Sequence, residues 1–112
     1  MAVTSTQSKA PASVSNFAVG RYLDDGTAAA FTITTGFQPR YVKVVNVDED
    51  TDGESLEWFE GMADASAILR VAAGTTTIIT TLGITPTAKG FTVGIQTDVN
   101  VTNEQISWLA IG

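Results

Sequence analysis

Residues 41–47, with the sequence YVKVVNV, give the clearest indication of how this chain folds. Five of these seven residues are aromatic or β-branched, and such side chains favour the extended backbone of a strand. Alternate residues of a strand point to opposite faces of its sheet. One face therefore carries Val42, Val44 and Asn46, and the other carries Tyr41, Lys43, Val45 and Val47.

Similar short segments occur along most of the chain, separated by Gly, Pro, Asp and Asn clusters that are typical of turns. The region 61–66 is predicted as a turn or as one helical turn, and it is the only helix candidate. We expect a loop around Pro86 at 83–89. The segments predicted as strands are 17–22, 30–34, 41–47, 55–60, 68–71, 75–82, 91–95, 99–101 and 105–111.

These segments predict an all-β fold, because no helix long enough to connect parallel strands can be placed between them. We expect an antiparallel β-sandwich or jelly roll of about eight short strands, with an extended N-terminal arm. The 112 residues correspond to one domain. The expected division is an arm at 1–16, which is too polar to form a core, and a β-sandwich domain at 17–112.

The composition argues against catalysis. The chain has no His and no Cys, the two residues on which most side-chain chemistry near neutral pH depends. No segment resembles a nucleophile–base pair or a phosphate-binding loop. We therefore expect a protein that is not an enzyme and that uses no cofactor.

The charge is unevenly distributed. The net charge is −6, and seven of the twelve acidic residues lie between Asp48 and Glu60. Such a balance disfavours nucleic acid as a partner, and no segment is long and apolar enough to span a membrane. The acidic stretch has two interpretations, a solvated loop or a face that docks on a basic partner surface.

Within this stretch, Asp48, Asp50 and Asp52 precede Gly53 with the spacing of the first half of a calcium-binding loop. The bidentate Glu expected six residues after the Gly is replaced by Phe59, and the flanking segments are predicted strands rather than helices. A plain acidic hairpin loop is therefore the favoured interpretation, and calcium binding is the alternative.

Trp58 and Trp108 raise the question of carbohydrate binding, because flat aromatic rings near Asp, Asn and Gln bind sugars on many β-sandwiches. Each Trp also lies in an alternating segment with apolar neighbours two residues away. This pattern favours a place in the core for both rings.

Four segments, in this order and spacing, resemble small virion proteins of tailed bacteriophages, in particular the capsid decoration proteins that are also called cement or staple proteins. The resemblance extends over about residues 17–112. The segments are GFQPRYVKV at 36–44, EWFEGM at 57–62, GFTVG at 90–94 and NEQISW at 103–108.

This resemblance implies a non-enzymatic protein on the exterior of the capsid, assembled in the bacterial host cytoplasm, that bridges neighbouring coat-protein subunits and stabilises the shell. The implied partners are the major capsid protein and further copies of the chain, as a dimer or trimer at a symmetry axis. A virion carbohydrate-binding module for host adhesion and a tail or fibre component remain the alternatives. The resemblance itself supplies no site residues. The acidic stretch and the apolar side chains supply the candidate partner-binding residues, which are Asp50, Asp52, Glu54, Phe37 and Phe59.

Overall fold

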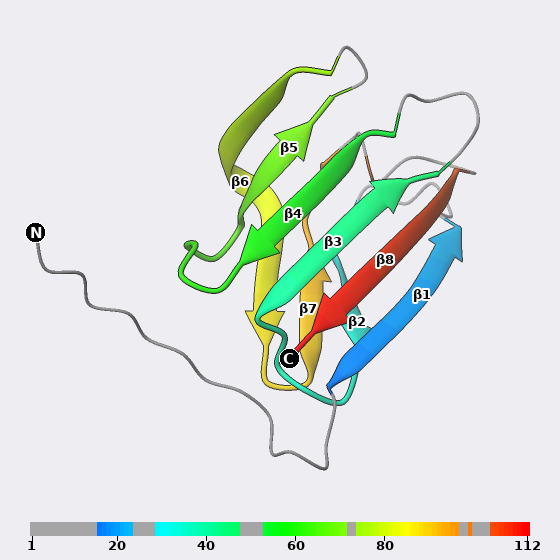
Figure 1. Cartoon of the computed structure of the whole chain (residues 1–112), viewed down its shortest axis with the longest axis vertical. Helices are drawn as coiled ribbons and strands as arrows, with labels where there is room; N and C mark the ends of the chain where they lie inside the picture. Colours follow the sequence, from blue (N-terminus) through cyan, green and yellow to red (C-terminus); the bar gives the residue numbers. More distant parts are fainter. Residues whose placement is uncertain (1–15, 24–28, 48–52, 72–73, 97–98, 100–103) are drawn as a thin grey trace, which may run out of the picture.

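The computed structural model describes residues 16–23, 29–47, 53–71, 74–96, 99 and 104–112 (Figure 1). These residues form eight strands and no helix. The strands are β1 (Phe17–Leu23), β2 (Phe31–Thr34), β3 (Tyr41–Asn46), β4 (Ser55–Phe59), β5 (Ser66–Arg70), β6 (Thr76–Thr87), β7 (Gly90–Val93) and β8 (Gln105–Ile111).

All neighbouring strands pair antiparallel in one sheet, in the order β1-β8-β3-β4-β5-β6-β7-β2. The predicted all-β antiparallel fold is therefore confirmed. The sheet is continuous and curls on itself into a half-barrel, and Figure 1 shows β7 and β2 behind β3 and β8. The two ends of this one sheet, β1 with β8 and β7 with β2, therefore pack against each other as the two separate sheets of a sandwich would.

The curl depends on a corner in the middle of β6. The first part of β6 pairs with β5 and the second part with β7, and the register shifts between Ala67, opposite Ile79, and Ser66, opposite Ile84. At this corner Leu82 adopts a left-handed backbone conformation with a φ of 63°. A Cβ on Gly83 would lie 2.4 Å from the backbone oxygen of Ser66, so the two strands approach as closely as they do only because this residue is Gly.

The predicted loop at 83–89 is wrong, because β6 continues through Pro86 to Thr87 and the turn occupies only Ala88 and Lys89. The amide of Gly94 donates to the oxygen of Gly83, which places the odd-numbered residues of β6 in hydrogen-bonding positions toward β7. The nitrogen of Pro86 therefore points away from β7, and its missing N–H leaves this pairing intact.

Two smaller strand predictions also differ from the structure. β7 ends at Val93, so that Ile95 lies beyond the strand and is exposed. Val99, predicted to begin a strand, is a buried turn residue, and residues 100–103 lie outside the described part of the chain. The segment 61–65 forms a turn rather than a helical turn, and Ser66 already begins β5.

The core lies inside the curl. Val42 and Val44 are fully buried, together with Asn46 on the same face, as the alternation of the YVKVVNV segment predicted. The Asn46 side chain donates a hydrogen bond to the Glu104 carboxylate, which satisfies this buried amide. The other core side chains are Leu56, Trp58, Ala67, Leu69, Ile84, Phe91, Val93, Val99, Ile106 and Ala110.

Both tryptophans belong to this interior. Trp58 is 4% exposed, and its indole N–H donates to the oxygen of Ala63 at 3.2 Å. Trp108 packs against the core with its ring edge-on to Phe91, at 5.5 Å between centroids. The contact joins β8 to β7 across the curl and holds the two arms of the sheet together.

Candidate interaction surface

The outer face of the sheet carries an unusual row of large apolar side chains. Cross-strand register aligns Phe17 of β1 with Ile111 of β8, Ile111 with Tyr41 of β3, and Tyr41 with Phe59 of β4. Residues directly opposite each other in an antiparallel pair share a face, so these four side chains lie side by side across four strands. We call Phe17, Ile111, Tyr41 and Phe59 the aromatic row.

Much of this row is open to solvent. The exposed fractions are 58% for Phe17, 41% for Ile111 and 47% for Phe59, and the neighbouring Val19 of β1 is 65% exposed. Together these side chains present on the order of 400 Å² of apolar surface, within the range in which the largest patch on a monomer is often functional. The outer face is therefore a candidate for protein–protein contact.

Tyr41 fixes the geometry at the β4 end of the row. Its hydroxyl donates to the carboxylate of Glu57 at 2.7 Å, and its ring lies 5.0 Å from that of Phe59 at an angle of 59°. Burial raises the pKa of Tyr41 to about 12, and the hydrogen bond and negative charge of Glu57 act in the same direction. The phenol therefore stays neutral, and Phe59 is held against it before any partner binds.

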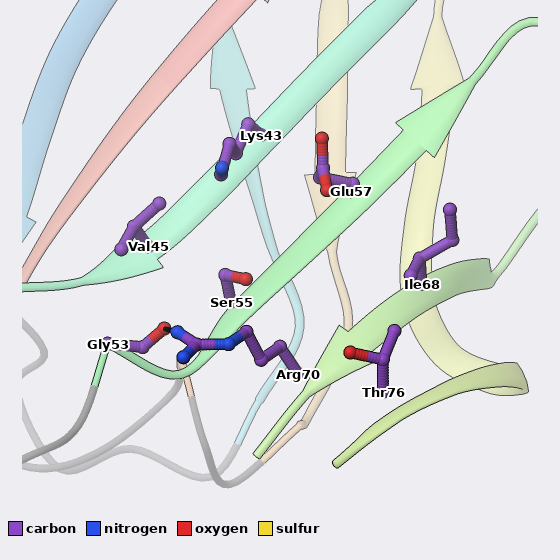
Figure 2. Close-up of a pocket in the computed structure, with 8 residues that line it drawn as sticks. All are labelled: Lys43, Val45, Gly53, Ser55, Glu57, Ile68, Arg70 and Thr76. Carbon is purple, nitrogen blue, oxygen red and sulfur yellow. Dashed lines mark hydrogen bonds between the residues drawn. The ribbon is translucent and has the colours of Figure 1, made fainter. Parts of the chain in front are cut away.

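Beside the aromatic row, the outer face of β3, β4, β5 and β6 is hollowed into a groove of about 280 Å³ (Figure 2). Lys43, Glu57 and Arg70 supply its charges, and Arg70 also donates to the backbone oxygen of Gly53 at 3.4 Å. The remaining lining side chains are polar or aliphatic: Val45, Ser55, Ile68 and Thr76. A groove with two cations and one carboxylate next to an apolar row suits recognition of a polar protein segment.

The structure places the predicted partner-binding residues in different settings. Phe59 belongs to the aromatic row. Phe37, in the loop before β3, packs partly buried against the core, and a Cβ on Gly112 would lie 2.5 Å from its ring. Glu54 is half-buried, and its backbone oxygen accepts a hydrogen bond from the amide of Asn46 at 2.8 Å.

The other predicted sites fall on residues that the structure does not describe. Asp50 and Asp52, and with Asp48 the candidate calcium loop, belong to the undescribed range 48–52. The proposed arm at 1–16 is described only at Asn16. Among the described residues, no group of three acidic side chains lies in an arrangement that could hold a metal ion.

Sequence reasoning missed most of the aromatic row. In β1 the large residues Phe17, Val19 and Leu23 alternate with the smaller Ala18 and Gly20, and the large set would ordinarily be assigned to the core. The structure reverses this assignment, because the absence of a side chain at Gly20 leaves space for the indole of Trp108 on the inner face. The usable signal was the match between a Gly in one strand and a Trp in another.

No helix in the described part of the chain is long and apolar enough to cross a membrane. Comparisons of the chain with known protein families, with curated proteins and with solved structures find no match.

Proposed function

We propose that this protein is a non-enzymatic structural component of a tailed-bacteriophage virion, which decorates the outside of the capsid and bridges neighbouring coat-protein subunits. The observation that carries the proposal is the exposed aromatic row on a preorganised sheet face. The resemblance of residues 17–112 to capsid decoration proteins supplies the identity of the partner.

The proposed docking surface is the outer face of β1, β8, β3 and β4. Covering the aromatic row would remove apolar surface from water, and the resulting gain in binding free energy would slow dissociation. The acidic stretch 48–60 would act earlier, by attracting a basic coat-protein surface during encounter. The aromatic row would therefore set the affinity, and the acidic stretch would set the association rate.

Binding to purified empty shells that lack this protein tests the proposal. The protein should cosediment with the shells to a saturable level and raise the temperature at which they disassemble, because a ligand that binds only the intact assembly stabilises it. Failure to cosediment at any salt concentration would contradict the proposal.

Neutralising the acidic stretch tests the encounter step separately. The triple variant Asp50→Asn, Asp52→Asn and Glu54→Gln should associate with shells more slowly than wild type and show a flatter salt dependence, since exposed charges are screened over about 8 Å at physiological ionic strength. Its dissociation rate should change little. Association at the wild-type rate across a salt series would show that recognition depends on the apolar contacts alone.

The carbohydrate-binding alternative can no longer rest on Trp58, which is buried and whose N–H is bonded within the protein. The exposed aromatic rings that it would need are those of Phe17 and Phe59 in the aromatic row. A tail or fibre location differs from shell decoration in copy number, which is counted on the purified virion.

A further inference from the structure

β1 forms one edge of the sheet, and its outward backbone groups can be assigned. The amide of Gly112 donates to the oxygen of Asn16 at 2.8 Å, which extends the β1–β8 register by one pair. Hydrogen-bonded and non-hydrogen-bonded pairs alternate along an antiparallel ladder. Even-numbered residues of β1 therefore bond to β8, and the N–H and C=O groups of Phe17, Val19, Arg21 and Leu23 point away from the sheet.

This edge lacks the features that usually prevent association. It is seven residues long, against four in β2 at the other edge. It contains no Pro or bulge, and one charged residue, Arg21, is all that interrupts its apolar outer face. In Figure 1 no other strand is drawn beyond β1. Long apolar edges of this kind are templates for pairing with another strand.

We propose that β1 pairs antiparallel with β1 of a second copy of this chain, about a two-fold axis at Gly20. In this register Phe17 lies opposite Leu23 of the second copy, and Val19 lies opposite Arg21. All four outward residues then fall in hydrogen-bonded pairs, which gives about eight backbone hydrogen bonds across the axis. The two sheets join into one, and each aromatic row ends at the junction against Leu23 of the other copy.

The sequence of β1 is complementary to itself in this register. On the outer face, large apolar residues meet at both ends of the pairing, and the Arg21 side chains are not directly opposite each other. On the inner face, Tyr22 meets the small Ala18 of the second copy, and Gly20 meets Gly20 at the closest point of the ladder. A register shifted so that Arg21 faced Arg21 would place like charges together and leave Phe17 unpaired.

A second copy is favoured over an unrelated strand because β1, aligned antiparallel with itself, is complementary over its whole length. An unrelated partner would require no such symmetry. The interface also has the isologous form of most homodimers, in which the same patch serves both subunits. The inference stands independently of the proposed coat-protein partner, since it concerns β1 alone.

Sedimentation of the full chain tests the proposal. We expect a species of twice the chain mass of 11.7 kDa. Val19→Pro removes an outward N–H that β8 does not use, so this variant should keep the β-sheet circular dichroism of wild type and sediment as a monomer. Ala18→Pro is the matched control: it removes an N–H that bonds to β8 and should lower the melting temperature sharply. A monomeric wild type, or a Val19→Pro variant that remains dimeric, would overturn the proposal.

Cysteine cross-linking tests the register and does not rely on a proline variant folding. The chain has no native Cys, so introduced thiols report without interference. The double variant Val19→Cys, Arg21→Cys should form a covalent dimer under mild oxidation, because these positions face each other within disulfide range. Val19→Cys alone and Arg21→Cys alone should remain largely uncross-linked. Cross-linking of a single variant as readily as the double variant would overturn the register.

The chain's own residues 1–15 are the competing occupant of this edge. A variant that lacks them should dimerise as wild type does. If wild type were monomeric and the shortened chain dimeric, the N-terminal segment would be the strand that covers β1, and the proposal would be wrong.

Discussion

Two phenylalanines that the sequence suggested as partner contacts should respond to substitution in opposite ways. Phe59 is 47% exposed in the aromatic row, whereas Phe37 packs against the core and the chain end at Gly112. Phe59→Ala should weaken shell binding with a small loss of stability. Phe37→Ala should destabilise the protein, and the folded fraction should bind normally.

The magnitudes follow from the exposed area. About half of the Phe59 side chain, on the order of 100 Å², remains available for a partner, and covering it at about 25 cal/mol per Å² contributes ~2.5 kcal/mol, or roughly 70-fold in affinity. The lost contact with Tyr41 should cost about 1 kcal/mol of folding stability. For Phe37→Ala we expect about 2–3 kcal/mol of destabilisation, less than for a fully buried Phe.

Urea unfolding and equilibrium cosedimentation with empty shells measure the two effects separately. Affinity should be measured well below the unfolding transition of the weaker variant, so that loss of folded protein does not imitate loss of binding. Wild-type affinity in Phe59→Ala would refute the assignment of the aromatic row as the docking surface. Equal loss of affinity in both variants would show that the loop before β3 also contacts the shell.

Three further predictions follow from the interior, the aromatic row and the acidic loop. Gly20→Ala places a Cβ 2.5 Å from the indole of Trp108 and should lower the free energy of unfolding in urea by about 1–3 kcal/mol. The loss should be smaller when Trp108→Phe is also present, and equal losses in both backgrounds would contradict this contact. The pKa of Tyr41 is raised to about 12 from about 10 in the unfolded chain, so its stabilising contribution should be complete below pH 10 and lost as the pH rises through 12. The difference in unfolding free energy between wild type and Tyr41→Phe should therefore narrow across that window. A difference that stays constant with pH would contradict this prediction. Calcium followed by a chelator should leave the melting temperature unchanged, whereas a rise of several degrees with calcium would identify 48–54 as a metal site.

The fold class could be predicted from the sequence because β-branched alternation and turn residues are local signals. The YVKVVNV segment indicated the correct faces for Val42 and Val44, since a strand with one buried face fixes its own register. The corner in β6 could not be predicted. Pro86 usually marks a loop, and its place in a strand depends on which side of the chain the neighbouring strand occupies.

The docking face was only partly predictable, because the exposure of its residues also depends on the strand order. Phe59 stood out because it interrupts an acidic region, but Phe17 looks like a core residue in its own segment, and nothing in the sequence placed Ile111 next to it. Their exposure is a consequence of tertiary packing, in which Trp108 fills the inner face beside Gly20 and turns the large residues of β1 outward. Local patterns contain no information about that choice until the strand order is known.

A reconstruction of empty shells incubated with the purified protein tests the central claim most directly. The account predicts added density on the outer surface of the shell, at seams between coat subunits and in numbers comparable to those of the coat protein. The outer face of β1, β8, β3 and β4 should contact that surface. A shell without added density, or density confined to a tail or its attachment site, would contradict the proposed function.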